Sequence, residues 1–468
     1  MFKPTVLFGT VLLLSGCSMT PSYQRPEAPV AESYPSSEGG GVSALSEGLG
    51  WESFFGDPRL QSLIELSLEN NRDLRKAGLQ VERIAAIYNI QRSVLIPSLD
   101  GTASGTRTRT PGDLTSSGSA QTSSQYQIGI GIPSYELDFF GRVRSLKNQV
   151  LEQYLATEEA KQSAQLSLVT AVARQYLMLL AAEEQLGLAQ QSLEVAERAY
   201  GLNEQTYEAG VSNELDLRTA ESQRAAVRSR LAGIEQTRAQ LENGLIELVG
   251  SPLPSDLPPM GSLAGQNLLE TLPAGIPSDL LMRRPDIRAA EHQLKAAYAN
   301  IGVARAAFFP SVKLTAFGGT ASAELSGLFE DGSGMWRFAP TITLPLFAAG
   351  KNKAQLEVAS IEQRMEIASY EKTIQTAFRE VADALATRAF IDRQIESEGI
   401  RVASSQRRYE LSSQRFEAGV DSFVPVLLAQ QELFSAEQSL VEVRLRKLTN
   451  ATALYGALGG GWNEPQVR

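Results

Sequence analysis

The sequence predicts a mainly α-helical protein with a small β part, built from two copies of one structural unit. Three observations predict this fold class. Short motifs recur at a fixed distance along the 468-residue chain, two very long stretches carry apolar residues every seven positions, and four short runs alternate with a period of two. These patterns are typical of internal repeats, coiled-coil helices and strands with two unlike faces.

The internal repeat keeps its register over most of the chain. The segment 71–75 recurs as 284–288 at an offset of 213 residues (286 − 73), and 207–211 recurs as 416–420 at an offset of 209 (419 − 210). The difference of four residues falls in the strand region between these motifs. Chance similarity does not keep register in this way. Each half therefore has the same parts in the same order: a helix, two strands and two long helices.

The two long helices of each half are predicted to pair as a coiled coil. In the first half, apolar side chains recur every seven residues from Val172 to Tyr207, and the positions 209 residues later are apolar except for Arg388. A seven-residue repeat keeps a narrow seam facing a partner helix and imposes a left-handed supercoil. Gly210 and Gly419 should close the turns with positive φ angles. The caps expected for the returning helices are Ser212 and either Asp421 or Ser422.

The alternating runs predict four strands. In the run 336–346 aromatic and aliphatic side chains share one face and polar side chains the other; 126–132 and 312–316 alternate likewise, and the run near 99–106 is the weakest. A lipid-facing barrel wall alternates in this way, as does a soluble sheet packed on a helix. In lipid, four strands cannot close a barrel with a lumen, and open edges leave backbone groups unpaired. A barrel would then be shared between chains, and three chains would supply twelve strands around a channel.

The N-terminus has the features of an export signal. Lys3 precedes an apolar stretch from Val6 to Leu14, and small residues lead to Cys17. This stretch is too short to span a bilayer core, which needs about 20 apolar residues. The order Leu-Ser-Gly-Cys resembles a bacterial lipobox, in which the cysteine is acylated and the chain is cut before it. No later segment has 18 uninterrupted apolar residues, so a membrane crossing is expected to use strands.

Composition disfavours several classes of function. With 43 basic and 53 acidic side chains the net charge is −10, which disfavours nucleic-acid binding. One cysteine and one histidine disfavour a zinc site or a histidine-based triad. His292 lies on a helical pattern and is expected to be solvated. No glycine-rich phosphate loop with lysine occurs. We therefore expect no enzymatic activity, no metal site and no nucleic-acid partner.

Several motifs carry a family resemblance. They are YQRPEAP at 23–29, NNRDLR at 70–75, LPAGIPSDLL with RRPDI between 272 and 287, AAFFPS at 306–311 and ALGGGW at 457–462. Together with the lipobox they resemble the outer-membrane efflux factors of the TolC superfamily, most closely the lipid-anchored OprM-like (NodT-type) branch. The resemblance covers nearly the whole mature chain.

This resemblance implies a homotrimer in the outer membrane of a Gram-negative bacterium. Each chain would give four strands to a twelve-stranded transmembrane β-barrel, above a periplasmic α-helical barrel of long antiparallel coiled-coil helices. Acyl and diacylglycerol lipid on Cys17 would anchor it, with no other cofactor. The implied partners are outer-membrane lipid, a periplasmic adaptor (membrane fusion) protein and a proton-driven inner-membrane pump of the resistance-nodulation-division type. The implied function is a passive exit duct for drugs, solvents or other small toxic molecules, giving multidrug resistance.

The expected domain organisation follows the repeat and the resemblance. It comprises a signal peptide at 1–16, a lipid-anchored segment and equatorial belt at 17–70, a first repeat at 71–250, a linker and equatorial segment at 251–283, a second repeat at 284–458 and a C-terminal tail at 459–468.

The resemblance places the closed periplasmic end of the duct at the two helix turns. Related channels often carry an inward acidic ring and a nearby basic residue, but Val424, Leu428 and Gln431 are uncharged here. We therefore expect an apolar constriction that closes by dewetting. On the other helix pair Leu215 joins the gate, and Asp216 and Arg218 are polar latches or solvated surface charges. The expected adaptor contacts are the helix tips Gly210, Val211, Ser212, Asn213, Gly419, Val420, Asp421 and Ser422.

Other functions remain open at this point. The alternatives are an outer-membrane channel for protein secretion or heavy-metal export, and a non-channel trimeric coiled-coil lipoprotein. Seven methionines and one histidine supply few soft-metal ligands, which argues mildly against copper or silver export.

Overall fold

The computed structural model describes residues 18–34, 50–266, 268 and 283–460. The signal peptide, Cys17, most of the 251–283 linker's second half and most of the C-terminal tail lie outside these residues. The chain divides into two compact units, and each is described by itself. The first unit comprises residues 1–27, 80–158 and 289–371; the second comprises residues 28–79, 159–288 and 372–468.

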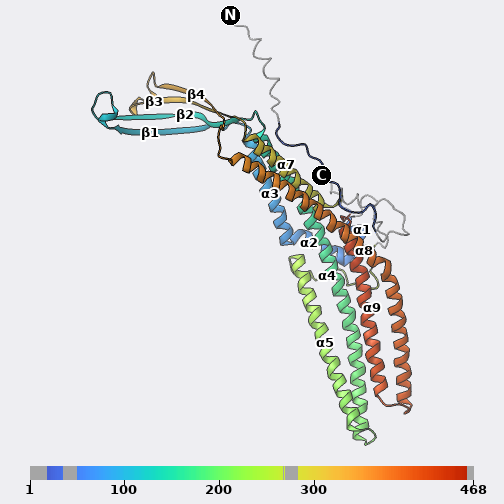
Figure 1. Cartoon of the computed structure of the whole chain (residues 1–468). Helices are drawn as coiled ribbons and strands as arrows, with labels where there is room; N and C mark the ends of the chain where they lie inside the picture. Colours follow the sequence, from blue (N-terminus) through green and yellow to red (C-terminus); the bar gives the residue numbers. More distant parts are fainter. Residues whose placement is uncertain (1–17, 35–49, 267, 269–282, 461–468) are drawn as a thin grey trace. The chain divides into compact units, whose positions relative to one another are not determined.

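The predicted duplication is confirmed element by element (Figure 1). Short helices α1 (Trp51–Phe54) and α2 (Pro58–Asn70) precede it. The first copy comprises α3 (Arg72–Ser93), β1 (Asp100–Thr110), β2 (Gln121–Leu137), α4 (Arg142–Glu208) and α5 (Glu214–Val249). The second comprises α7 (Pro285–Ala306), β3 (Ser311–Ser322), β4 (Gly334–Thr343), α8 (Lys351–Glu417) and α9 (Val424–Ala457). Both α4 and α8 have 67 residues, and they start 209 positions apart (351 − 142), which is the offset of the sequence motifs.

The first unit contains one antiparallel sheet with the strand order β1-β2-β3-β4 (Figure 1). The central pair, β2 and β3, joins the two copies of the repeat. Gly129 faces Gly319 across this pair, and a Cβ on Gly129 would lie 2.8 Å from the Cα of Gly319. The Phe317 ring covers the space above Gly129 and Gly131. Glycine is therefore required where these strands approach most closely.

The period-two prediction for the strands is confirmed, and the apolar face is bare. The register pairs Ile130 with Gly318 and Gly318 with Trp336, so these residues share one face. On this face Ile130 is 58% exposed and Trp336 81% exposed. The predicted run 336–346 is displaced, because β4 covers Gly334–Thr343. A large exposed apolar face indicates an apolar surrounding or a partner.

The coiled-coil prediction is confirmed in the second unit, where α4 packs against both α5 and α9. Ala189 of α4 forms a buried cluster with Ile234 of α5 and Phe434 of α9. The alanines that flank the predicted stripe are more buried than most of the stripe itself, because small side chains let helices approach closely. Ala182, Ala189 and Ala196 are each at most 4% exposed. The contact between α4 and α9 joins the two copies of the repeat.

The second unit also has a compact core at the bases of these helices. The rings of Phe54 and Tyr455 stack at 4.5 Å, and Phe55 meets both edge-on. The Asn71 side chain accepts a hydrogen bond from the Leu74 amide, which caps α3, and donates to the carbonyl of Leu248. These contacts hold α1, α3 and α9 among the ends of the long helices.

The prediction of a solvated His292 is wrong. His292 Nδ1 lies 2.6 Å from Glu152 Oε2, and its side chain is only 20% exposed. The sequence did not reveal this contact because Glu152 lies 140 residues earlier, on α4.

One stretch of α4 is long and apolar enough to pass a composition test for a membrane helix. Half of that stretch is buried inside the protein, as expected for a core helix that packs against two neighbours.

Candidate helix-tip gate and channel wall

The two helix turns have the same backbone structure. Gly210 and Gly419 have φ angles of 73° and 72°, which confirms the predicted left-handed residues. At the first turn the Gly210 amide donates to Tyr207 O and the Val211 amide to Thr206 O, both at 2.9 Å. Gly419 and Val420 make the equivalent bonds. These are Schellman motifs, so each long helix ends on a fixed, glycine-dependent reversal.

The predicted caps of the returning helices are wrong. The cap of α5 is Asn213, whose side chain accepts a hydrogen bond from the Asp216 amide at 2.9 Å. The cap position of α9 is Phe423, which has no side-chain cap bond. Asp421 instead accepts two hydrogen bonds from Arg415, which hold the pKa of its carboxyl below the ordinary value. The second turn is thus closed by an ion pair and by Pro425 in the first turn of α9.

Aromatic packing stabilises the region behind the tips. Phe423 meets Phe416 edge-on at 5.4 Å and packs with Ala220, Val426 and Leu427 in one buried cluster. The cluster draws side chains from α4, α5, α8 and α9, so both helix pairs are joined at this level.

The proposed gate residues of α9 lie on one face that the chain itself leaves open. Val424 is 43% exposed, Leu428 is 51% exposed and Gln431 is also exposed. Their neighbours Val426, Leu427 and Ala429 are buried. Gln431 Nε2 donates to Gln223 Oε1 of α5 at 2.8 Å, a link across the two hairpins that sequence reasoning missed.

The predicted latch charges of α5 pair within that helix and the turn before it. Arg218 pairs with Glu221 at 2.8 Å and with Glu214 at 3.4 Å, and Asp216 accepts a bond from Ser212 at 3.4 Å. Leu215 is 74% exposed beside them. In the single chain these groups therefore follow the surface-charge alternative rather than linking one helix to another.

Both tips present an apolar residue to solvent. Val211 is 82% exposed and its equivalent, Val420, is 62% exposed. The predicted tip residues thus fall together at two exposed turns of matching structure.

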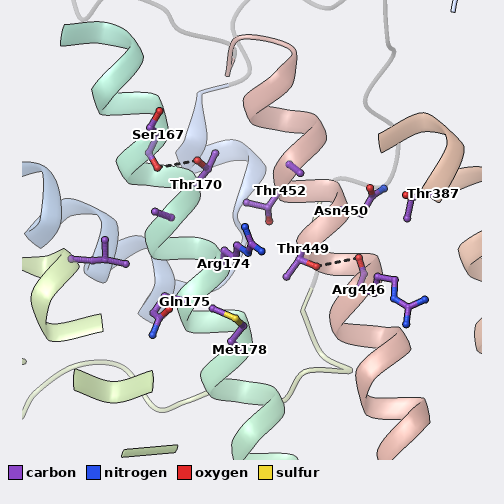
Figure 2. A pocket seen from close by; sticks show the side chains of 13 residues that line it. Ser167, Thr170, Arg174, Gln175, Met178, Thr387, Arg446, Thr449, Asn450 and Thr452 are labelled. Carbon is purple, nitrogen blue, oxygen red and sulfur yellow. Dashed lines mark hydrogen bonds between the residues drawn. The ribbon is translucent and has the colours of Figure 1, made fainter. Parts of the chain in front are cut away.

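A cavity of about 690 Å³ lies farther along α4 and α9, and α5 and α8 each add one residue to its lining. Figure 2 shows Arg174 extending from α4 toward Thr449 of α9. No carboxylate lines this cavity within the described residues, while Arg174 and Arg446 both do. Arg446 lies 18 residues after Leu428, which is five helical turns, so both residues fall on the same face of α9. The remaining lining is mainly hydroxyl and amide groups: Ser167, Thr170, Gln175, Thr387, Thr449, Asn450 and Thr452.

A family model for outer membrane efflux proteins matches residues 63–251 and 276–460. The chain belongs to the outer membrane efflux protein family. The solvent efflux pump outer membrane protein SrpC of Pseudomonas putida is 45% identical, over 99% of both chains. OprJ, an outer membrane protein of Pseudomonas aeruginosa, is 41% identical over 97% of this chain and 95% of its own.

Solved structures agree with this assignment. The open-state MtrE outer membrane channel of Neisseria gonorrhoeae has a TM-score of 0.86 and 40% identity, over 95% of this chain and 98% of its own. A membrane protein of Pseudomonas aeruginosa has a TM-score of 0.89 at 40% identity, over 95% and 100%. The mainly helical fold with a small four-stranded sheet, the outer-membrane location and the function of an efflux channel are therefore confirmed.

The efflux channel also has a well-built site that sequence reasoning missed. The Glu291 carboxylate of α7, only 7% exposed, accepts hydrogen bonds from Tyr23 and Arg25 of the N-terminal segment and pairs with Lys295. Burial alone would raise the pKa of Glu291, but the bonds and charges of Arg25 and Lys295 hold it below 4.5. Among the described residues, no group of His, Cys, Asp or Glu is arranged to hold a metal ion.

Proposed function

We propose that three copies of this chain form the exit duct of a tripartite efflux pump. The observation that carries the proposal is the open sheet: β1 and β4 each pair with one described strand, and the apolar face is exposed. Unpaired strand edges in lipid cost several kcal/mol for each backbone group, so the edges must pair with other copies. Three copies give twelve strands, enough to enclose a water-filled lumen.

The solutes are drugs and organic solvents. Relatives named for solvent, toluene and antibiotic efflux support this class. The duct itself is passive, and a periplasmic adaptor protein and a proton-driven inner-membrane pump supply the solutes and the energy. The adaptor contacts the exposed tips 210–213 and 419–422, where two valines are open to a partner.

Val424, Leu428 and Gln431 form the closed end of the duct, together with Leu215 of α5. Because their face of α9 is open in the chain, three copies can bring these side chains together at the axis. An apolar ring closes a pore by excluding water and needs no charge. Lipid on Cys17 anchors the mature chain, because several acyl chains bind a membrane firmly.

The test combines assembly with transport. Purified full-length protein in detergent should have three times the mass of one chain and should conduct ions in a planar bilayer. Deletion of the gene should lower tolerance to toluene and antibiotics, and wild-type plasmid should restore it. A non-conducting monomer would refute the trimeric duct. Loss of protein secretion with unchanged drug tolerance would favour the secretion alternative.

A further inference from the structure

Because the two halves of the chain are equivalent, the contact between α4 and α9 within one chain predicts a contact between neighbouring copies. The duplication makes α8 the equivalent of α4 and α5 the equivalent of α9, at the offset of 209. In the closed ring of the proposed function, on which this inference rests, helix pairs from the two copies of the repeat alternate. Within a chain α4 meets α9, so between chains α8 must meet α5 of the next copy in the same geometry.

Three described contacts define that geometry along the α4–α9 seam. Gln430 of α9 donates to the carbonyl of Ser192 at 3.3 Å. Farther along, Arg444 pairs with Glu184 at 3.6 Å. Near the base, a Cβ on Gly456 would lie 3.1 Å from the Cγ2 of Thr170. The three contacts run antiparallel along the two helices.

Subtracting 209 from each α9 residue gives its equivalent on α5, and adding 209 to each α4 residue gives its equivalent on α8. Each of the three contacts then places a glutamate of α5 opposite an arginine of α8. Gln430 and Ser192 become Glu221 and Arg401; Arg444 and Glu184 become Glu235 and Arg393; Gly456 and Thr170 become Glu247 and Arg379. Three opposite-charge pairs in antiparallel order are the complementarity that a real interface between the two helices requires.

The partners that these side chains have within the chain are mostly neighbours on their own helix, which a second copy can replace. Arg379 pairs with Asp383 at 3.2 Å, Arg401 with Glu398 at 2.7 Å and Glu221 with Arg218 at 2.8 Å. Arg401 also donates to the Ser435 carbonyl of α9 at 3.4 Å. All three arginines are exposed. On the same helix Phe390 is 55% exposed and Ile400 is 63% exposed, which adds apolar area for burial. We propose that α5 of one copy docks on α8 of the next through the pairs 221–401, 235–393 and 247–379.

The charges at one of these positions also disfavour docking of α8 on α9 of another copy. Inside the chain α9 carries Arg444 and α4 carries Glu184, whereas the corresponding pair between copies has the charges exchanged. An α8 helix that docked on α9 would therefore bring Arg393 against Arg444. Like charges at that position select α5 over α9 as the partner of α8.

The test uses disulfide trapping in the full chain. Cys17 is the only natural cysteine, so introduced thiols give a clean readout. Glu247→Cys with Arg379→Cys should link chains to one another under mild oxidation. In the equivalent contact within the chain, a Cβ on Gly456 would lie 3.9 Å from the Cβ of Thr170, a separation that suits a disulfide. The matched control joins Glu247→Cys with Arg446→Cys, on α9 instead of α8, and should give no chain-to-chain product beyond the single variants.

Charge reversal gives a second, independent reading. Glu235→Arg alone and Arg393→Glu alone should each lower the trimer's resistance to dissociation by heat in detergent. The double variant should recover it, because the exchanged charges attract again. Efficient linking of the control pair, or no recovery in the double variant, would overturn the inference. A trimer that shows no 247–379 link refutes only this interface, whereas a monomeric wild-type protein refutes the proposed function itself.

Discussion

The gate assignment makes a quantitative prediction for Leu428→Ser. Full burial of a leucine contributes about 1.5–3 kcal/mol, and Leu428 is still 51% exposed in the chain, so closing the ring can gain about 1 kcal/mol per copy. Three copies lose about 3 kcal/mol of closure on substitution, which at about 1.4 kcal/mol per tenfold change raises the open-to-closed ratio about a hundredfold. Single-channel recording of the purified trimer measures this ratio directly.

The matched control is Leu202→Ser on α4. Leu202 is 45% exposed, so this substitution removes a similar half-exposed leucine away from the α9 face. It should leave the open probability unchanged. An unchanged open probability in Leu428→Ser would refute the apolar gate. Equal opening in both variants would show that the bundle is merely weakened.

Four further predictions concern other parts of the chain. Gly419→Ala should cost about 1–2 kcal/mol from its positive φ alone, since a Cβ there meets no atom, and hydrogen exchange at the second turn should speed up. Arg284→Gln should cost about 1–3 kcal/mol, measured as a lower dissociation temperature, because it leaves two partly exposed carboxylates and the Ala457 carbonyl without their buried partner. The pKa of Glu291 is lowered on folding, so this carboxylate stabilises the fold above pH 4.5, and that stabilisation is lost as the pH falls through the pKa of the folded state. Proteolysis within residues 18–27 should therefore increase at that acidic pH and stay unchanged at pH 7. Replacing Arg174 and Arg446 together by Gln should shift the reversal potential of the channel toward cation preference, and no shift would place the cavity outside the conducting path.

Much of the fold could be predicted because its signals are periodic and repeated. A seven-residue stripe persists through α4, and the same pattern returns 209 residues later, so length and pairing are each specified twice. The turn glycines are equally readable, because few residues other than glycine adopt a positive φ. Strand limits are read less well from the sequence: β4 ends at Thr343, while the apolar alternation continues to Leu346.

The chemistry of the site could be predicted less well because it depends on contacts between distant segments. Nothing near Glu291 in the sequence indicates Tyr23 or Arg25, which lie more than 260 residues earlier. The cap of α5 was missed by one residue, since Ser212 and Asn213 are both good caps and only the backbone decides between them. The link from Gln431 to Gln223 joins two neutral side chains that carry no motif.

The two copies of the repeat share a backbone but not a surface, and this difference gives each copy its own role. The position of Glu291 on α7 corresponds to Gly78 on α3 (291 − 78 = 213), and no described residue of α3 is buried. In the first unit α7 is therefore covered by the chain's own N-terminal segment: Thr20 lies over Gly302, and Arg305 reaches the Met19 carbonyl. The segment thus contacts α7 at two places fourteen residues apart, at Glu291 and at Arg305. The second copy thus holds residues 19–25 along α7, whereas in the first copy no described residue of α3 is buried.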